Sequence, residues 1–361
     1  MDRKYRVAIV GGTGMVGQRF AILLENHPWF EVTTIAASPR SAGKTYAEAT
    51  AGRWFMPKPL PASMAGIVVK DASDVAAVTA DVDFVFCAVD MDKAATKKLE
   101  EDYARAETPV ISNNSANRMA ADVPMLIPEI NHGHTAVIAT QRQRLGTKVG
   151  FIAVKPNCSI QSYVPPLQAL MDFEPTKVLA CTYQAISGAG KTFDSWPEMM
   201  DNVIPYIGGE EQKSEQEPLK IWGRVENGVV VPATAPDITT QCIRVPVTDG
   251  HLAAVFVSFT KKPSKDEIIA RWRGFRSYAA ELGLPSAPDP FLVYCDEDNR
   301  PQTRLDRDLG NGMTVSMGRL REDTHYDYKF VGLSHNTLRG AAGGGVLMAE
   351  LLCKQGFIPK K

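Results

Sequence analysis

Cys158 is a residue whose type and setting could support covalent chemistry. It lies in the stretch VKPNCSIQS (Val154–Ser162), after a Pro-Asn pair and before a run that could open a helix. As a thiolate it would be a nucleophile, whereas as a buried neutral thiol it would be a small apolar core residue. The local residues alone favour the core interpretation, so the rest of the chain must decide between the two.

A glycine-rich stretch near the N-terminus predicts a dinucleotide site. GGTGMVGQRF follows an apolar run, Arg6–Val10, and leads into helical apolar spacing over Met15–His27. It fits both G-x-G-x-x-G and G-x-x-G-x-x-G. Such glycines permit a tight turn and let the backbone approach a pyrophosphate at a helix N-terminus. The predicted cofactor contacts in this turn are Gly11, Gly12, Thr13, Gly14, Met15, Val16 and Gly17.

The end of the second expected strand indicates which dinucleotide binds. An NAD site usually has an acidic residue there for the ribose 2′-hydroxyl. The stretch AASPRSAGK has none, and Glu31 lies at the other end of the strand. Hydroxyl and cationic side chains suit a 2′-phosphate, which favours NADP over NAD, although the cations could equally be solvated loop charges. These residues are Ser38, Arg40, Ser41 and Lys44.

A nicotinamide cofactor beside a reactive cysteine narrows the chemistry. A thiolate can attack an acyl carbonyl, and the resulting thioester can accept a hydride. Such an enzyme would interconvert an acyl phosphate or acyl-CoA and an aldehyde. It also needs a base and groups that hold an anionic substrate.

The elements that must position these residues divide the chain in two. Strand-like and helix-like runs alternate in the first third, which predicts a parallel sheet with right-handed crossovers. The expected strands are Arg6–Val10, Phe30–Ser38, Val82–Val89, Thr108–Asn113 and Pro124–Ile130, and the expected helices are Met15–His27 and Lys93–Ala106.

Longer, one-sided strand patterns follow between about residues 176 and 260. KVLACTYQAIS, TTQCIRVPV and HLAAVFVSF predict a mostly antiparallel sheet with one face on helices, the last two runs lying around a TDG turn. Ser334–Gly356 predicts a long helix rich in small residues. The predicted fold class is therefore α/β: a Rossmann-type dinucleotide-binding domain (1–157, completed by the C-terminal helix 335–361) and an α+β catalytic domain (158–334).

Composition excludes several classes of function. The 361 residues carry 40 basic and 41 acidic side chains, which gives no electrostatic reason to expect nucleic acid or an anionic membrane as a partner. No apolar run is long enough to span a bilayer, and the N-terminus lacks a signal-peptide pattern. Six scattered cysteines form no C-x-x-C pair or zinc-type cluster, which predicts free thiols, a cytoplasmic location and no metal.

Seven ordered motifs together carry a family resemblance. GGTGMVGQRF, SNNSANRM, PNCS, QAISGAGK, GGEEQK, CIRVPVTDGH and SHNTLRGAAGGG occur in that order between about Val7 and Leu352. In this order they resemble aspartate-semialdehyde dehydrogenase, particularly its fungal and archaeal-like branch. The resemblance implies NADPH-dependent reduction of L-4-aspartyl phosphate through a cysteine thioester, in the pathway toward lysine, threonine and methionine. It also implies a homodimer through the middle-domain sheet, or a tetramer of paired dimers.

Residue roles follow from the same resemblance. Cys158 matches the nucleophile, His251 the acid–base, Gln184 the glutamine near the thioester, and Asn157 the residue that orients the acyl phosphate or its oxyanion. A helix starting near Ser159 would stabilise the thiolate. The substrate-binding matches are Arg244 for the α-carboxylate, Glu210 (or its neighbour Glu211) for the α-amino group, and Lys213 and Arg118 for phosphate; the nicotinamide contacts are Ser187, Gly188, Gly190 and Asn336.

Several alternatives use the same residues. Malonyl-CoA reductase shares the scaffold, but its substrate has no ammonium group for Glu210 to bind. N-acetyl-glutamyl-phosphate reductase and glyceraldehyde-3-phosphate dehydrogenase share the thiol chemistry with less similar motifs. A non-catalytic NADP-binding regulator would be expected to lack the thiol or the base. A papain-like hydrolase could use Cys158 and His251 but has no need of the glycine turn.

Overall fold

The first sheet is built from short, buried apolar runs. In the computed structural model, which describes residues 3–361, its strands are β1 (Tyr5–Val10), β2 (Phe30–Ala37), β3 (Lys70–Asp71), β4 (Phe84–Cys87), β5 (Val110–Ser112) and β6 (Ile152–Val154). They lie in the order β3-β2-β1-β4-β5-β6, and every pairing is parallel. Buried parallel strands with crossovers between them confirm the expected Rossmann-type domain.

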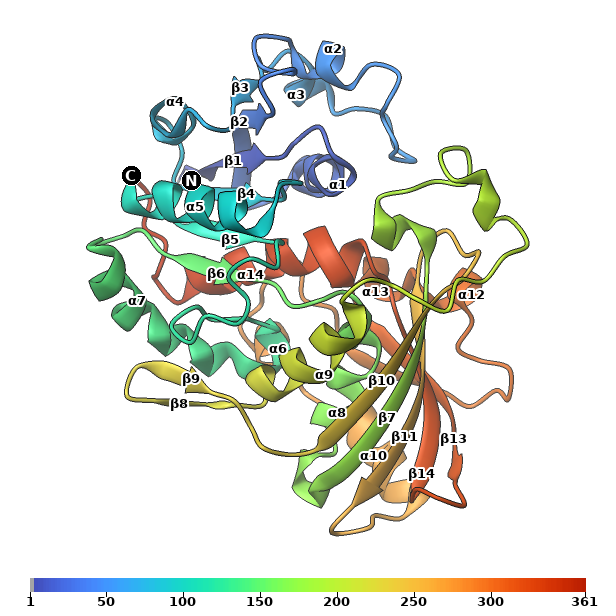
Figure 1. Cartoon of the computed structure of the whole chain (residues 1–361). Helices are drawn as coiled ribbons and strands as arrows, with labels where there is room; N and C mark the ends of the chain where they lie inside the picture. Colours follow the sequence, from blue (N-terminus) through green and yellow to red (C-terminus); the bar gives the residue numbers. More distant parts are fainter. Residues whose placement is uncertain (1–2) are drawn as a thin grey trace.

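Helices cover this sheet and begin where the sequence provides caps. The Asp92 side chain accepts hydrogen bonds from the Ala94 and Ala95 amides and so caps the start of the long surface helix α5. Gly14 precedes the first helix, α1, directly after the glycine turn. The helices of this half are α1 (Met15–Leu24), α2 (Tyr46–Thr50), α3 (Ala62–Ala65), α4 (Val75–Thr79), α5 (Lys93–Arg105), α6 (Pro128–Asn131) and α7 (Ile138–Leu145) (Figure 1).

The second sheet is mixed. Its strands are β7 (Pro175–Gln184), β10 (Asp237–Arg244), β11 (His251–Phe259), β12 (Leu292–Cys295), β13 (Val315–Glu322) and β14 (Tyr328–Ser334), in the order β10-β7-β11-β14-β13-β12. Three of its pairings are antiparallel and two are parallel, so the expected mostly antiparallel sheet is confirmed. The strands on either side of the TDG turn are not neighbours, because β7 lies between β10 and β11. A separate hairpin joins β8 (Arg224–Glu226) to β9 (Val229–Val231).

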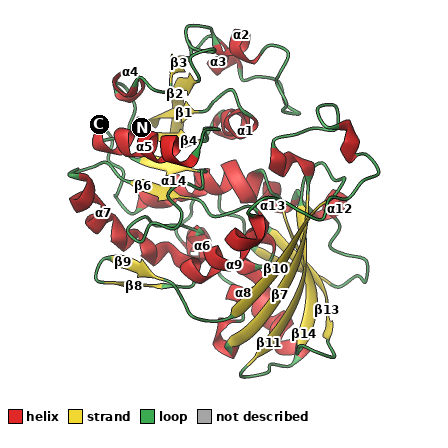
Figure 2. Cartoon of the chain, viewed as in Figure 1, coloured by secondary structure: helices red, strands yellow, loops and turns green. Residues whose placement is uncertain are grey.

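One face of the second sheet is packed on helices. Burial alternates strictly along β11, whose core-facing residues Ala253, Val255 and Val257 lie in one apolar cluster with Leu167 and Trp272. Figure 2 shows the long strands with helices gathered on one side of them. The helices of this half are α8 (Val164–Gln168), α9 (Glu210–Ile221), α10 (Lys265–Arg273), α11 (Tyr278–Glu281), α12 (Thr303–Asp306) and α13 (Leu309–Gly312).

The last helix, α14 (Gly343–Lys354), returns to the first domain and contacts α1 and β5 (Figure 1). It begins later than the sequence predicts: β14 continues to Ser334, and a π-helical turn at Leu338–Ala342 precedes the helix. The expected strand at Pro124–Ile130 is also wrong. Only Met125 makes a bridge, with Val154, because Pro128 starts α6. The domain boundary at residues 157 and 158 stays a prediction.

Candidate active site

Cys158 lies just beyond the carboxyl end of β6, where ligands bind in open parallel sheets. Its side chain is half-buried. The expected helix after it is wrong: Ser159–Ser162 is a single 3-10 turn, and α8 begins only after Tyr163 leaves helical geometry. A helix dipole therefore contributes little to this thiol. Its anionic form must be stabilised by neighbouring side chains.

His251 is brought to Cys158 from the second sheet. Its Nε2 lies 3.4 Å from the Cys158 Sγ. The other ring nitrogen, Nδ1, accepts a hydrogen bond of 3.0 Å from the Ala185 amide. Because Nδ1 is an acceptor, the proton of the neutral imidazole is on Nε2, facing sulfur. His251 therefore presents a hydrogen-bond donor to the thiol.

Strand register explains why three distant residues meet here. Gln184 ends β7 and is paired in register with Arg244, which ends the parallel strand β10. His251 starts β11, and the residue after it, Leu252, pairs with Tyr183, which precedes Gln184. The three side chains therefore share one end of the sheet and its covered face, and each is at least 95% buried. This end of the sheet faces Cys158.

Burial keeps both the thiol and the imidazole neutral in this state. It lowers the pKa of His251 to about 3, with a further contribution from Arg244. Burial and, to a smaller extent, the Glu210 carboxylate raise the pKa of Cys158 to about 11. Three cations, Lys155, Arg118 and Arg244, act in the opposite direction on the thiol.

A carboxylate network forms the next part of the site. Glu210 Oε1 accepts hydrogen bonds from Asn157 Nδ2 at 2.9 Å and from Gln184 Nε2 at 3.2 Å. Glu211 instead binds the side chain of Gln241 and the amide of Cys242 on β10. Of the two acids, only Glu210 faces the cavity at Cys158.

The two cationic side chains expected to bind phosphate differ in how many hydrogen bonds they already make within the protein. Arg118 donates to Glu217 Oε1 at 3.0 Å and to two backbone carbonyls, so its guanidinium is already well bonded. Lys213 is one-third exposed and contacts Glu210 Oε2 at 3.3 Å. The lysine is therefore the freer of the two to bind an added anion.

A cavity of about 440 Å³ gathers most of these residues. Its lining includes nine residues that the sequence predicts for the site: Val16, Arg118, Asn157, Cys158, Ser187, Gly188, Glu210, Lys213 and Asn336. Gln184, Arg244 and His251 lie behind the lining. A side chain at Gly188 would crowd the site, because a Cβ on it would lie 3.0 Å from the His251 ring and 3.1 Å from Arg244 Nη1. Asn336 donates to the Ser187 Oγ at 2.8 Å, while Gly190 turns the chain with φ +66°.

A second cavity, of about 640 Å³, adjoins the glycine turn and is lined by Gly11, Thr13, Gly14, Ser38 and Arg40 among others. Asp90 lines both cavities. A ligand along the glycine turn could thus extend toward Cys158. In the turn itself, a Cβ on Gly11 would lie 2.2 Å from the Ala88 carbonyl oxygen, and one on Gly17 would lie 2.3 Å from the Gly11 oxygen. Both positions therefore require glycine, and the cavity fits a dinucleotide.

Sequence reasoning missed part of this second cavity. Ser41 is buried and does not line it; its Oγ instead accepts a hydrogen bond from Arg53 Nη2 at 3.0 Å. Arg53 does line the cavity, and Lys44 does not. Asp71 is an unexpected acid in the lining, with Oδ1 held by the Ser73 amide and hydroxyl. No motif marks Arg53, because it comes from a loop after α2.

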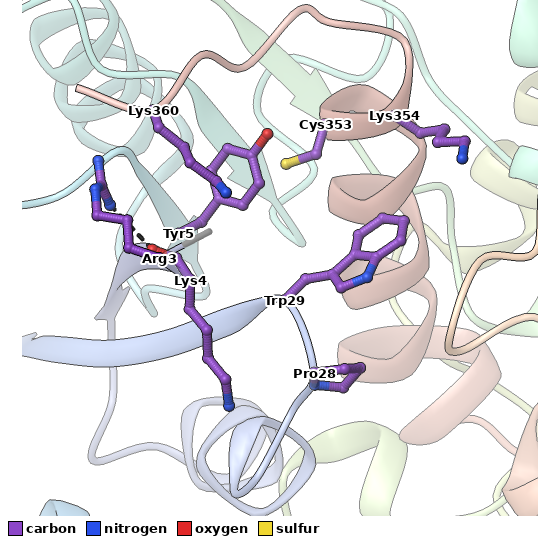
Figure 3. Close-up of a pocket in the computed structure, with 8 residues that line it drawn as sticks. All are labelled: Arg3, Lys4, Tyr5, Pro28, Trp29, Cys353, Lys354 and Lys360. Atoms are coloured by element: carbon purple, nitrogen blue, oxygen red, sulfur yellow. Dashed lines mark hydrogen bonds between the residues drawn. The ribbon is translucent and has the colours of Figure 1, made fainter. Parts of the chain in front are cut away.

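Other features of the described residues offer no competing active site. A pocket of about 390 Å³ near the chain ends is lined by Tyr5, Trp29, Cys353 and four cations (Figure 3). Its cysteine lies beside Tyr5, and burial raises the pKa of the Cys353 thiol far above its usual value. Within residues 3–361 there is no group of three or more potential metal ligands, and no helix is long and apolar enough to cross a membrane.

Comparisons with known proteins agree with the two-domain arrangement. The family described as semialdehyde dehydrogenase, NAD binding domain, matches residues 6–138, and semialdehyde dehydrogenase, dimerisation domain, matches residues 167–339. The aspartate-semialdehyde dehydrogenase of Methanothermobacter thermautotrophicus is 43% identical over 96% of this chain and 98% of its own. That of Aspergillus fumigatus is 40% identical over 98% and 99%. The crystal structure of the Candida albicans enzyme with NADP superposes with a TM-score of 0.88 at 37% identity, covering 99% of this chain and 100% of that one.

Proposed function

The chain belongs to the aspartate-semialdehyde dehydrogenase family, and from that premise we propose that it reduces L-4-aspartyl phosphate to L-aspartate 4-semialdehyde with NADPH. The reaction releases phosphate and serves the biosynthesis of lysine, threonine and methionine. The single observation that carries the proposal is the 3.4 Å approach of His251 Nε2 to Cys158 Sγ, beside a cavity that adjoins the glycine turn.

Cys158 is the nucleophile in the proposed mechanism. Its thiolate attacks the acyl carbon of the substrate, phosphate leaves, and a thioester forms on Sγ. Bound NADPH supplies the hydride that reduces this thioester. The Nε2–H of His251 lies where it can donate a hydrogen bond to the oxyanion that hydride addition creates; this intermediate then collapses to the aldehyde as the C–S bond breaks and the Cys158 thiolate leaves. Neutral imidazole suits this role, because burial lowers the pKa of His251 to about 3.

Charged side chains around the thiol suit an amino-acid phosphate. In the proposal Arg244 binds the α-carboxylate, Glu210 binds the α-ammonium and Lys213 binds the phosphate. Arg118, which is already paired with Glu217, orders the cavity wall and adds positive potential. Binding an ammonium would also offset the Glu210 charge, which otherwise raises the pKa of the Cys158 thiol.

NADP is the cofactor in this proposal. Gly11, Thr13 and Gly14 would hold the pyrophosphate at the start of α1. Arg40 and Arg53 both line the cavity beyond the second strand and would pair with the 2′-phosphate. Ser187 and Asn336, which are hydrogen-bonded to each other, would contact the nicotinamide. The glycine turn, the two arginines and this polar pair together fit such a dinucleotide.

A homodimer through the second sheet is part of the same proposal. The sheet face opposite the helices carries half-buried apolar side chains, among them Leu179, Tyr183, Leu252 and Phe256. Such a face is stable when a second copy covers it. Tetramer formation and a cytoplasmic location stay predictions, the latter resting on six cysteines that are all free.

A spectrophotometric assay at 340 nm tests the function. Purified protein is given aspartate semialdehyde, phosphate and NADP⁺, and in parallel malonyl-CoA with NADPH. We expect phosphate-dependent formation of NADPH in the first reaction and little change in the second. Turnover of malonyl-CoA alone would contradict the proposal, as would tight NADP binding without any turnover.

A further inference from the structure

A cavity of about 750 Å³ is lined by residues of α1, α13 and α14 and by the loops between them. It is larger than the cavity at Cys158 and the cavity at the glycine turn, and it shares no lining residue with either. Its volume is within the range of small-molecule sites in proteins. The proposed reaction assigns no ligand to it.

One wall of this cavity is the outward face of α1. Arg19, Ile22 and Leu23 have the i, i+3 and i+4 spacing that places three side chains on one face of a helix. Ile22 and Leu23 are half-buried, whereas Phe20 and Leu24 on the neighbouring face are buried in the core. Two apolar side chains that the core does not fully cover therefore lie beside one arginine.

The rest of the cavity wall is largely apolar and is held in place. Met313, Leu338 and Val346 contribute apolar side chains to it. Ser286, in a loop of the wall, donates from its amide and its hydroxyl to the buried Glu350 carboxylate, at 3.0 and 2.5 Å. The cavity is therefore pre-formed, as small-molecule sites usually are.

Arg19 has no partner for its charge within residues 3–361. Its Nε is buried without a hydrogen-bond partner there, as are those of Arg6 and Arg142. Those two arginines use a terminal nitrogen instead. Arg6 contacts Asp81 at 3.5 Å, and Arg142 donates to the Val149 carbonyl at 2.8 Å. No carboxylate of the described chain lies within ion-pair distance of Arg19, so its guanidinium is left for an acceptor from outside the protein.

The charges around the cavity have both signs. Two cations, Arg19 and Lys58, and three acids, Glu25, Asp289 and Asp308, line it. Three acids against two cations leave one excess negative charge, so a simple anion such as phosphate is disfavoured. A ligand that carries both a carboxylate and an ammonium group matches this wall.

Arg19 and Asp308 are neighbours that do not form an ion pair. The charge of Asp308 acts on Arg19, as does that of Asp249, which does not line the cavity. The contacts of Asp308 are long, 3.7 Å to Arg307 Nε and 3.7 Å to His335 Nε2. A ligand that bridges Arg19 and Asp308 therefore needs its own two charges close together, as they are on the α-carbon of an amino acid.

A single turn separates this cavity from the one at Cys158. Leu338 lines the first cavity and Gly340 lines the second, and both belong to the π-helical turn before α14. A Cβ on Gly340 would lie 2.8 Å from the Cys158 Cβ. A ligand in the larger cavity would thus contact the turn behind Cys158 without occupying the space of the substrate.

We propose that this larger cavity is a second small-molecule site, which binds an α-amino acid with an apolar side chain. The ligand carboxylate pairs with Arg19 and its ammonium group with Asp308. Its side chain lies among Ile22, Leu23 and Met313. The inference goes beyond the proposed reaction and does not depend on it.

NMR of the Met313 methyl group, in protein labelled with [¹³C-methyl]methionine, tests this proposal. The Met313→Leu variant identifies the signal by its loss. Titration with L-leucine and with L-phenylalanine should shift this signal saturably, with a Kd of about 1 mM or tighter for at least one of them. For L-leucine, the matched probes are 4-methylpentanoate, which lacks the ammonium group, and 3-methylbutylamine, which lacks the carboxylate. Both should bind at least about tenfold more weakly.

Arg19→Gln should weaken binding of the amino acid by at least about tenfold, because its carboxylate loses a charged partner. Arg304→Gln is the matched control, since Arg304 is an exposed arginine on α12 outside the cavity lining, and it should bind as the wild type does. Equal affinities of Arg19→Gln and wild type would overturn the proposal. The probes use the wild type, so the proposal stays testable if Arg19→Gln does not fold.

Two further results would overturn the proposal. One is an unshifted Met313 signal with both amino acids at about 20 mM. The other is equal binding of L-leucine and either of its truncated probes. Saturating NADP and the Cys158→Ser variant should both leave the shift unchanged, whereas displacement by NADP would place the ligand in the cofactor cavity and refute the second site. None of these readouts needs turnover, so this proposal and the proposed function fail separately.

Discussion

His251 Nε2 lies 3.4 Å from Cys158 Sγ, although the two residues are 93 positions apart and are positioned by different sheets. Cys158 follows the last strand of the parallel sheet, and His251 starts a strand of the mixed one. The site therefore exists only where the two domains meet. A change in how the domains pack would alter this distance before it disturbed either sheet.

Cys158→Ser should abolish the phosphate-dependent oxidation of aspartate semialdehyde, by at least about 10³-fold in kcat, because a serine hydroxyl is a far weaker nucleophile at neutral pH. NADP binding, followed by fluorescence titration, should change little, since the glycine turn lies in the first domain. Cys181→Ser is a suitable control, because this half-buried thiol is on β7 and outside the cavity. Wild-type turnover in Cys158→Ser would remove the nucleophile assignment.

His251→Gln should lower kcat by about 10²- to 10³-fold, which is the usual contribution of one positioned hydrogen-bond donor to a developing oxyanion. It should also change how stability depends on pH. Burial depresses the pKa of His251 in the folded state to about 3, so below about pH 6.5 the unfolded chain binds a proton that the folded chain does not. Stability is therefore lost as pH falls through this window.

The size of that effect can be measured by urea unfolding at pH 7 and pH 5, at one fixed protein concentration. The wild type should lose up to about 2 kcal/mol more unfolding free energy between these pH values than His251→Gln does. An identical loss in both proteins would mean that His251 is already protonated in the folded state at pH 5. His325→Gln, a change at an exposed position, should behave as the wild type.

The glycine turn could be predicted because its evidence is local. Strand, turn and helix are consecutive in sequence, and Gly17 is required by its contact with the Gly11 carbonyl within that same unit. The helix after Cys158 could not be excluded in this way. Its apolar run is compatible with a helix, but the chain breaks at Tyr163 to place the run inside the core. Tertiary packing, not propensity, decides that segment.

The buried face of α9 could not be predicted from the sequence either. Its buried residues include Glu210, Ser214 and Glu217, so the side turned to the protein is polar and gives no apolar periodicity to recognise. Polar residues are buried there because they bind side chains from other parts of the site: Glu217 binds Arg118, and Ser214 binds Ser159. For the same reason the sequence left Glu210 and Glu211 as alternatives.

Arg40→Ala should raise the KM for NADP by about 10- to 100-fold and leave the KM for NAD nearly unchanged, because only NADP carries the 2′-phosphate. Arg53→Ala should act in the same direction, since Arg53 lines the same cavity. Lys44→Ala is the control from the same loop, and it lies outside the cavity lining. Steady-state kinetics with each cofactor provide the measurement. Equal effects on both cofactors would exclude a contact with the 2′-phosphate.

Glu210→Gln and Glu211→Gln form a matched pair that separates the substrate carboxylate from its neighbour. Glu210 faces Asn157, Gln184 and the cavity, whereas Glu211 is turned to β10. Removing the charge at Glu210 should raise the KM for aspartate semialdehyde by about 10- to 100-fold, since a buried ammonium would lose its charged partner.

The same Glu210→Gln change should make the Cys158 thiol more acidic, because the Glu210 carboxylate raises its pKa. Iodoacetamide alkylation should therefore accelerate while turnover falls, a combination that simple damage to the fold does not produce. Glu211→Gln should leave both KM and alkylation close to wild type and lower the melting temperature slightly, through the lost bonds to Gln241 and Cys242. The opposite ranking of the two variants would assign the ammonium contact to Glu211.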